Sequence, residues 1–216
     1  MAMNTVRPEA LFSMGDTELK ELFKPSMERK VPKGQAVWRA GDDPDAVWMV
    51  KEGRANLVIE GVEGGASMVH FCTKAQAFCP AAAIGGQPYP CSAVAATDMT
   101  VVSVPRAAFM GLVDRLPEFA RKLLVQMAAQ VCDAHRQKAM STAPVKSRLA
   151  SLLGSLSHRY AGRDLPFTRQ ELADMSDTTV ESAIRTLSRW EKSGVIESGR
   201  GSIHIHRPQA LEEEVA

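Results

Sequence analysis

The sequence predicts an α+β protein in three parts: an N-terminal antiparallel β-roll, a long dimerisation helix and a C-terminal winged helix-turn-helix. Three observations lead to this prediction. Closely spaced turn signals divide residues 31–104 into short strand-like runs. The next segment repeats apolar side chains at helical spacing. Residues 168–207 then contain two helix-start motifs and a short hairpin. The predicted domain boundaries are residues 1–116, 117–143 and 144–216.

The bulk composition excludes some classes of protein. The chain has 216 residues, of which 45% are hydrophobic, and a net charge of +1. No apolar run approaches the roughly 18 residues of a membrane span, and the N-terminal stretch lacks the apolar segment of a signal peptide. We therefore expect a cytoplasmic protein with no membrane partner. The four cysteines then favour reduced thiols or ligands over structural disulfides.

The first part of the chain is predicted to be a helical lead-in followed by many strands. Residues 1–30 form the lead-in, and its apolar anchors are Leu11, Phe12, Leu19, Leu22 and Phe23. Turn signals rich in glycine, proline and aspartate then separate short runs typical of strands. The clearest of these runs are 46–50, 55–59, 67–72 and 100–104. Short strands at this spacing indicate an antiparallel barrel or roll.

A long helix is predicted to open at Pro117 and to run from residue 118 to about residue 140. Its apolar side chains recur at alternating spacings of four and three, which is a heptad seam. The seam consists of Ala120, Leu124, Met127, Val131 and Ala134. Such a seam favours pairing with a second copy of the helix. The alternative is a helix packed on its own β-roll, a face that Phe119, Leu123 and Val125 are expected to serve.

The C-terminal part contains two capping-box patterns. Thr168 is followed by Glu171, and Thr178 is followed by Glu181, each three residues later. This spacing predicts one helix directly after Thr168 and a second directly after Thr178. Residues 175–177 form the turn between them. A hairpin with strands at 195–198 and 202–206 then adds a wing.

The second of these helices has two different faces. Ala183, Leu187 and Trp190 recur at helical spacing and form the predicted inward face. Val180, Glu181, Ile184 and Arg185 lie on the other side. An arginine can bond guanine, a glutamate can accept from cytosine, and apolar side chains can touch thymine methyls, so this face suits a DNA major groove. The bland alternatives are a capping role for Glu181 and a solvated charge at Arg185.

The segment TRQELADMSDTTVESAIRTLSRWEKSGVI, residues 168–196, resembles the DNA-binding domain of the Crp/Fnr superfamily of bacterial transcription regulators. Its VESAIR stretch, with Val before the Glu, is closer to the Fnr-like branch than to the cyclic-AMP branch, which has Arg there. The resemblance places the base-reading pair on Glu181 and Arg185 and implies a palindromic operator related to TTGA…TCAA. Ile184 departs from the small polar residue usual in that branch. The remaining predicted DNA contacts are Thr168, Arg169, Gln170, Thr179, Ser182 and Arg200.

The glycine pattern of the first part also resembles the family's cyclic-nucleotide-binding-type β-roll. Gly34, Gly41 and Gly53 fall where that roll needs positive φ and tight corners. The nucleotide contacts of the family are missing, however. Where cyclic-nucleotide-binding members have a glutamate for the ribose, this chain has Pro80, and where they have an arginine for the phosphate it has Cys91. Because an unpaired buried phosphate is costly, cyclic AMP is not the expected effector.

The chemistry that replaces the nucleotide is left open by the sequence, and no cofactor is assigned. Cys79 lies where some haem-binding, gas-sensing members of the superfamily have an axial cysteine, with His70 as a candidate second ligand. Cys79 can equally be a small buried hydrophobe at a strand end. Oxidation between two cysteines and a four-ligand site with His70, Cys72 and Cys91 are further alternatives. The absence of cysteines before Cys72 disfavours an N-terminal iron–sulfur cluster.

These observations predict a homodimeric DNA-binding transcription regulator that responds to a signal in its β-roll, and not an enzyme. Its expected partners are double-stranded DNA, a second copy of the chain and, for an activator, RNA polymerase. One alternative is a constitutive regulator whose β-roll binds no ligand. The other is a thiol redox protein that uses Cys79, although no acid–base pair or nucleophile–histidine spacing supports it.

Overall fold

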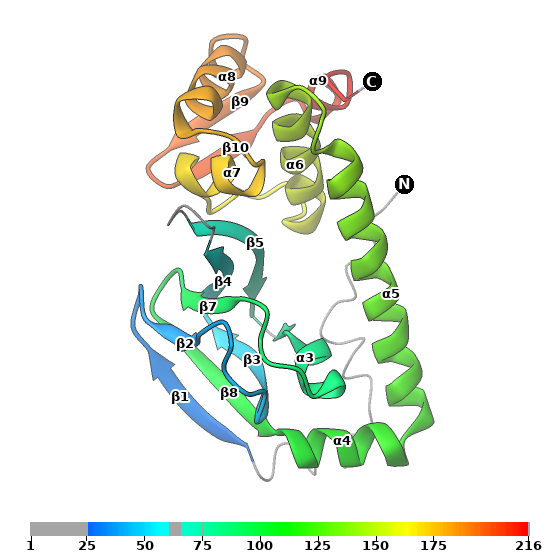
Figure 1. The fold of residues 1–216 in the computed structure, drawn as a ribbon. Coiled ribbons are helices and arrows are strands. Elements are labelled where there is room, and N and C mark those ends of the chain that lie inside the picture. Colours follow the sequence, from blue (N-terminus) through cyan, green and yellow to red (C-terminus); the bar gives the residue numbers. More distant parts are fainter. Residues whose placement is uncertain (1–25, 61–65, 75, 216) are drawn as a thin grey trace. The chain divides into compact units, whose positions relative to one another are not determined.

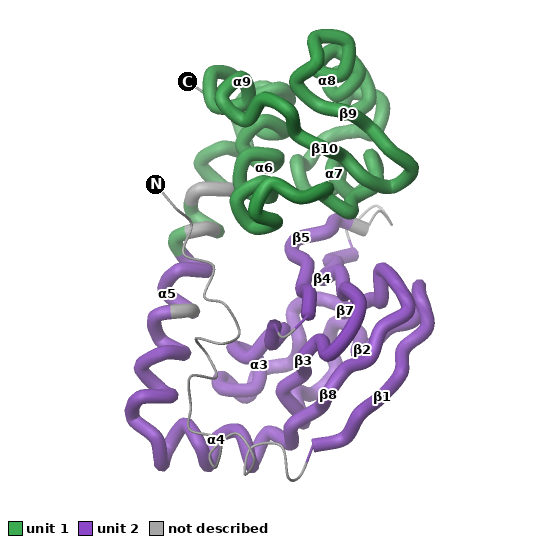
Figure 2. The backbone as a smooth tube through the Cα atoms, turned by 180° about the vertical axis from the view of Figure 1, so that it is seen from behind, with its two compact units in different colours: residues 1–5, 132–216 green, residues 6–131 purple. Residues whose placement is uncertain are grey.

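The computed structural model describes residues 26–60, 66–74 and 76–215 (Figure 1). They form two compact units, residues 26–131 and residues 132–215, so the division falls inside one long helix (Figure 2). The α+β class predicted from the sequence is confirmed, with antiparallel sheets first and a winged helix-turn-helix last. The proposed anchors of the helical lead-in lie outside the described residues, and the three-part boundaries stay a prediction.

Two four-stranded antiparallel sheets form the β-roll. One has the order β1-β8-β3-β6 and the other β2-β7-β4-β5. The strands are β1 (Met27–Val31), β2 (Ala36–Trp38), β3 (Ala46–Glu52), β4 (Arg54–Glu60), β5 (Ala66–Thr73), β6 (Ala77–Phe78), β7 (Ser92–Ala95) and β8 (Met99–Pro105). The four strand-like runs seen in the sequence are therefore confirmed. The prediction of a helical lead-in over residues 1–30 is wrong at its end, because residues 27–30 pair with β8 as an antiparallel strand.

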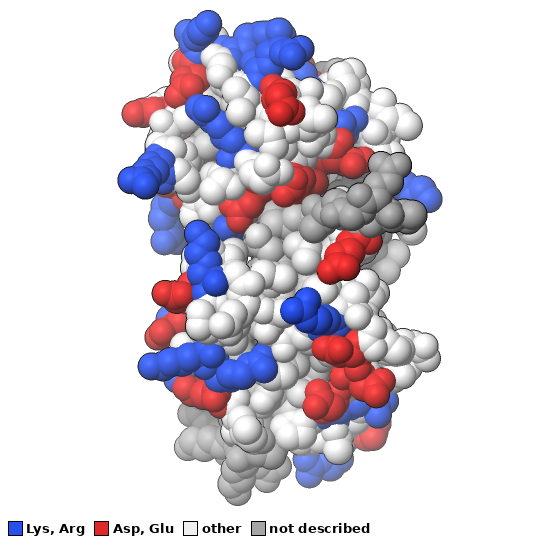
Figure 3. Space-filling model, turned by 60° about the vertical axis from the view of Figure 1, so that its left-hand side comes forward, with Lys and Arg blue, Asp and Glu red and all other residues white. Residues whose placement is uncertain are grey.

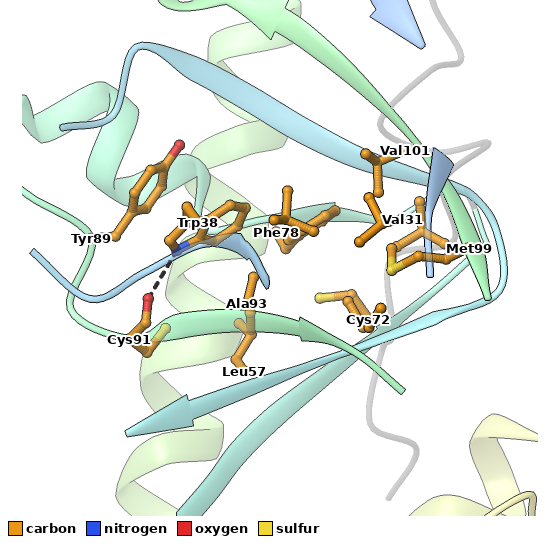
Figure 4. Packing of buried hydrophobic residues seen from close by; sticks show 14 of the residues in the cluster. Val31, Trp38, Leu57, Cys72, Phe78, Tyr89, Cys91, Ala93, Met99 and Val101 are labelled. Carbon is orange, nitrogen blue, oxygen red and sulfur yellow. Dashed lines mark hydrogen bonds between the residues drawn. The ribbon is translucent and has the colours of Figure 1, made fainter. Parts of the chain in front are cut away.

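The core of the roll lies between the two sheets (Figure 4). Val50 and Val101 face it from one sheet, and Leu57 and Ala93 face it from the other. Trp38 fills its centre, where its ring stacks on Phe78 and on Tyr89. Side chains alternate between the two faces of a strand. Val47 is three residues from Val50, and Val104 is three residues from Val101, so Val47 and Val104 point to the other face of this sheet. That face is covered by helices.

Three helices cover this second face of the first sheet: α3 (Pro80–Gly85), α4 (Arg106–Arg115) and the start of α5 (Pro117–Met140). Their buried side chains join Val47 and Val104 in a second apolar cluster. The helical contributions are Ala83, Phe109, Leu112, Phe119 and Leu123. Phe119 and Leu123 thus serve the β-roll as expected. Val125 does not, because half of its side chain is exposed.

The second unit is built from α6 (Val145–Arg159), α7 (Arg169–Met175), α8 (Val180–Lys192), β9 (Ile196–Gly199), β10 (Ser202–Ile205) and α9 (Pro208–Glu212). Leucines of α6 form its centre, and Leu149 and Leu153 are fully buried. Leu172 of α7 and Leu187 of α8 pack into the same interior. The wing gains a third extended segment, because Leu165 exchanges two backbone hydrogen bonds with Ile203 of β10 (2.8 and 3.0 Å).

Candidate functional site

Local capping chemistry fixes the start of α7. The Thr168 hydroxyl oxygen accepts a hydrogen bond from the backbone N–H of Glu171 at 3.2 Å, and the Glu171 carboxylate accepts one from the Thr168 N–H at 2.9 Å. This reciprocal pair satisfies two donors that a helix start otherwise leaves unpaired. The first capping box and its helix are therefore confirmed. Thr168 and Gln170 remain exposed, and Arg169 is half-buried.

The second capping box is wrong by one residue. Asp177 adopts a left-handed conformation (φ 50°), and the N–H of Thr178 donates back to the carbonyl of Ala173. Thr178 therefore still belongs to the turn. Thr179 is the residue that caps α8, and its hydroxyl accepts from the N–H of Ser182 at 3.2 Å. As a consequence, Glu181 has no role in a capping box and lies exposed in the first turn of α8.

The two faces predicted for α8 are confirmed. Ala183 and Leu187 are fully buried and Trp190 nearly so. Glu181, Ile184 and Arg185 are exposed on the opposite side, with Val180 half-buried beside them. An exposed isoleucine between an acid and an arginine is unusual for a solvated helix, which normally has a polar outer face. This outer face of α8 is the candidate recognition surface.

Arg148 of α6 holds the turn that presents α8. Its Nε donates to the carbonyl of Ser176 at 2.8 Å and its Nη2 to that of Asp177 at 2.9 Å. The Nη1 atom donates to the carbonyls of Ser141 (3.1 Å) and Ala143 (2.7 Å), which follow α5. One guanidinium therefore joins the segment between α5 and α6 to the turn before the recognition surface. Sequence reasoning missed this residue, because its partners are all backbone carbonyls.

We expect Arg148→Ala to lower the free energy of unfolding of this unit by about 3 kcal/mol. A hydrogen bond to a charged group contributes ~1.5–3 kcal/mol, and the contributions of bonds made by one side chain do not simply add. Arg148→Lys keeps the charge but lacks the planar fork, so it should restore less than half of the loss. Hydrogen exchange of peptides from α6 and α8 across a urea series measures the stability of this unit in both variants. Full recovery in the lysine variant would show that charge, and not the fork, stabilises the turn.

The wing and α7 meet at a small cavity of about 350 Å³. It is lined by Phe167, Thr168, Arg169, Ser198, Gly199, Gly201, Ser202 and Ile203. Glu191 of α8 fixes this corner, since its carboxylate accepts from the N–H of Ser198 (3.1 Å) and lies 3.7 Å from the Arg169 guanidinium. The structure thus brings two of the predicted backbone contacts, Thr168 and Arg169, next to the wing. Arg200 is exposed in the turn between the wing strands.

The net charge of the second unit adds little support for DNA binding. Between residues 144 and 210 there are ten Lys and Arg against seven Asp and Glu. Figure 3 shows both signs mixed over the face that it presents. Because a small net charge contributes little to phosphate binding, the argument for DNA depends on the particular side chains of the recognition surface.

The predicted seam of α5 is exposed in the single chain. Leu124 is 66% and Val131 54% exposed, which is unusual for large apolar side chains on a helix. Ala134 is exposed as well, whereas Ala120 and Met127 are half-buried. All five lie along one stripe, and this stripe adjoins the helix face of Phe119 and Leu123, whose side chains pack on the β-roll. The contact that would cover the stripe is absent from the chain's own described residues.

The candidate sensor residues lie beside the core of the β-roll. Cys79 precedes α3 and adopts a left-handed conformation (φ 48°, ψ 42°), which costs a non-glycine residue about 1–2 kcal/mol. Its sulfur lies 3.7 Å from that of Cys91, which directly precedes β7. The shared hydrogen bond and burial raise the pKa of Cys79, while the same hydrogen bond lowers the pKa of Cys91. The two thiols therefore share one hydrogen bond, in which either sulfur can be the donor.

The other ligand arrangements find less support. His70 is exposed on β5, and its ring stacks on that of the neighbouring Phe71. No group of three or more His, Cys, Asp or Glu side chains in the described ranges is placed to hold a metal ion. The four-ligand arrangement of His70, Cys72, Cys79 and Cys91 therefore does not form. Haem ligation by Cys79 stays a prediction. An axial ligand must have its sulfur accessible to the iron, whereas the Cys79 sulfur already contacts the Cys91 thiol.

The structure also shows the residues that stand where cyclic-nucleotide-binding members have their nucleotide contacts. Pro80 is buried in the first turn of α3, and it has no N–H to donate. Ser92 uses its hydroxyl within the protein, as it accepts from the N–H of Ala40 at 2.9 Å. The Cys91 carbonyl accepts from the indole N–H of Trp38 at 2.8 Å, and Figure 4 shows this bond. Ser92 and Cys91 thus already make hydrogen bonds within the protein itself.

The fold and these sites define a class: a β-roll of the nucleotide-binding type followed by a winged helix-turn-helix. Residues 28–115 match the family model of the cyclic nucleotide-binding domain, and residues 147–214 match that of the Crp-like helix-turn-helix domain. The chain belongs to the Crp/Fnr superfamily, and it is a transcription regulator of that type with a helix-turn-helix DNA-binding domain.

Similar proteins agree with this assignment. The fumarate and nitrate reduction regulatory protein of Yersinia pestis is 26% identical over 212 residues, covering 93% of this chain and 83% of that protein. The cyclic AMP receptor protein of Thermus thermophilus is 25% identical over 189 residues, 87% of each chain. The structure of FixK2 from Bradyrhizobium japonicum has a TM-score of 0.78 at 21% identity, over 88% of this chain and 98% of that one, and shows the same fold.

Within the described residues, none of the helices is both long and apolar enough to cross a bilayer.

Proposed function

We propose that this regulator binds, as a homodimer, a palindromic operator related to TTGA…TCAA, under control of a signal sensed in its β-roll. The observation that carries the proposal is the outer face of α8. Thr179 caps the helix, and Glu181, Ile184 and Arg185 follow as exposed side chains on the face opposite the buried Leu187. This geometry leaves the N-terminal half of the helix free to enter a major groove.

A base-edge partner is proposed for each side chain of the recognition surface. The Arg185 guanidinium suits the O6 and N7 atoms of guanine, and the Glu181 carboxylate suits the amino group of the paired cytosine. The two residues are four apart, so they lie on the same side of the helix. Val180 and Ile184 are proposed to touch thymine methyl groups of the neighbouring pairs. Thr168, Arg169, Gln170, Ser182 and Arg200 are proposed to contact the backbone and set the register.

The proposed dimer follows from the exposed seam of α5. Two recognition surfaces can read a palindrome only when they are held about one helical turn of DNA apart. Leu124 and Val131 supply an apolar stripe for this purpose, and the alanines at either end of the seam allow close approach of a second helix. A signal in the β-roll would then act by changing the population of the dimer arrangement that fits the operator.

Fluorescence anisotropy with the full reduced chain tests the base assignment. We expect tight binding to a duplex with two TTGA half-sites one turn apart, and Arg185→Ala should weaken it by about 1–3 kcal/mol, or roughly 5–150-fold. The loss should largely disappear on a duplex in which the G·C pair of each half-site is replaced, because the variant has lost the group that distinguishes this pair.

Arg200→Ala is the matched control, since it removes the same charge from the wing turn. It should weaken all duplexes by a similar factor and reduce the dependence of affinity on salt, as expected of a phosphate contact. A uniform loss with Arg185→Ala would show that Arg185 also contacts only phosphate. Equal affinity of the unaltered chain for the palindrome and for a scrambled duplex would contradict the proposed operator.

A further inference from the structure

Two thiols from different elements meet inside the β-roll. Cys79 and Cys91 are twelve residues apart in the chain, and their sulfurs are 3.7 Å apart because α3 and the following loop return the chain to the core. Cys91 is 4% exposed, whereas Cys79 is only partly buried and packs against the apolar cluster from its edge. Cys72 belongs to the same cluster. A small reagent can therefore reach the pair from the side of Cys79.

The hydrogen bond between the sulfurs makes the two thiols unequal. The bond and burial raise the pKa of Cys79, whereas the bond lowers the pKa of Cys91 against the opposing effect of burial. A thiolate is the nucleophilic form of cysteine. The pair thus combines a nucleophilic sulfur with a second thiol in contact with it, which is the arrangement of a cysteine and its resolving partner.

We propose that Cys79 and Cys91 form a reversible disulfide on reaction with a hydroperoxide, and that this bond is the signal that changes DNA affinity. The proposal rests on the proposed function, because it names the regulation of the same regulator. It also explains why a cysteine, and not a glycine, occupies the left-handed position before α3.

The reaction balances with the hydroperoxide as the two-electron oxidant. The Cys91 thiolate attacks the terminal oxygen, the O–O bond breaks, and the leaving oxygen departs as an alcohol or water after taking up a proton. Cys91 is then a sulfenic acid. The Cys79 thiol loses its proton and attacks the Cys91 sulfur, which expels the hydroxyl group as water and forms the S–S bond. A dithiol such as dithiothreitol reverses the step by thiol–disulfide exchange.

Formation of the bond requires a small movement with a defined direction. The sulfurs must approach by about 1.7 Å, from 3.7 Å to the length of a disulfide. Cys91 is held by Trp38, whose indole N–H bonds its carbonyl and whose ring stacks between Phe78 and Tyr89. Cys79 is attached to the short helix α3. We therefore expect α3 to take up most of the displacement.

α3 shares an apolar cluster with α4 and with the start of α5, so a displacement of α3 can reach α5. Ala83 of α3 is fully buried in the same apolar cluster as Phe119 and Leu123 of α5. Its carbonyl also accepts a hydrogen bond from the Arg106 side chain of α4 at 2.6 Å. Because close-packed contacts transmit displacement, a shift of α3 alters the support of the first turns of α5, where the seam begins.

Peptide mass mapping of the full wild-type chain tests the bond without any variant. The reduced protein is treated with stoichiometric hydrogen peroxide, thiols are blocked, and the peptides are analysed. We expect the peptides of Cys79 and Cys91 to be joined, with the loss of two hydrogen atoms and full reversal by dithiothreitol. A bond between other cysteines, or oxidation of either sulfur to a sulfinic acid without a bond, would overturn the proposal.

Operator affinity tests the regulatory part. Peroxide should change the affinity of the wild-type chain for the TTGA palindrome by about tenfold or more, a coupling of the size common in allosteric proteins. Cys79→Ser and Cys91→Ser should abolish the change, whereas Cys72→Ser and the exposed Cys132→Ser should retain it. A mapped disulfide with unchanged affinity would refute the switch. If the reduced chain does not recognise the palindrome at all, the operator proposal fails, and the mass map still decides whether the bond forms.

Discussion

Replacing Leu124 and Val131 of α5 together by glutamate is expected to abolish the dimer and to lower operator affinity by a factor of a hundred or more. Each glutamate would have to be buried without a partner in the helix–helix interface, at about 3–5 kcal/mol per charge. At ~1.4 kcal/mol per tenfold change, one such charge suffices for about a hundredfold loss. The dimer then dissociates, and a monomer contacts only one half-site. Light scattering gives the mass in solution, and anisotropy gives the affinity.

Val125→Glu provides the matched control. Val125 is 50% exposed on the same helix, and it receives the same charge. It lies roughly a third of a turn from the seam, since successive helical residues are separated by about 100°. We therefore expect this variant to remain a dimer with nearly unchanged operator affinity. If both variants dissociated, the interface would extend beyond the seam, and if neither did, α5 would not be the interface. Circular dichroism confirms that each variant is folded.

The winged helix-turn-helix could be predicted from the sequence because its signals are local. A capping box, an apolar stripe and glycines at the wing turn each lie within a few residues of the feature that they specify. The one error has a local cause as well. Thr178 and Thr179 are both good caps, and only the left-handed Asp177, which keeps Thr178 in the turn, decides between them.

The β-roll was harder to predict, because its strands depend on partners far away in the chain. Residues 27–30 are mostly charged and carry no strand pattern of their own, yet they pair with β8 more than seventy residues later. The short β7 likewise exists because β2 and β4 bracket it. Pairing of this kind leaves little trace in a single sequence. The glycines of the roll were a usable signal in the sequence. Gly34, Gly41 and Gly53 have φ values of 83°, 90° and 84°, the positive φ expected of them.

The candidate sites also differ in whether their residues lie close together in the sequence. The recognition surface was visible in the sequence because one helix contains all of it. The Cys79–Cys91 pair was only one of several cysteine combinations until the fold brought the two sulfurs together. Arg148 left no signal at all, as its hydrogen bonds are to backbone carbonyls, and these are the same for any sequence.

Gly53→Ala is expected to destabilise the β-roll by about 2–5 kcal/mol. Gly53 turns the chain from β3 into β4 with a φ of 84°, a conformation that costs any other residue about 1–2 kcal/mol. A Cβ atom there would also lie 2.6 Å from the carbonyl oxygen of Asp98 and 2.7 Å from the Cβ of Met99. Relief of such an overlap by backbone shifts adds about 1–3 kcal/mol. Hydrogen exchange of peptides from β3 and β8 across a urea series measures the stability of this unit alone.

Gly34→Ala separates the two contributions. Gly34 has nearly the same φ, 83°, but a Cβ atom would meet nothing within 4 Å. This variant should therefore show only the conformational cost of about 1–2 kcal/mol. The difference between the two variants then measures the contact between the β3–β4 turn and the start of β8, which closes one end of the core. Equal losses would show that the turn yields to the added methyl group and that φ alone requires glycine at both positions.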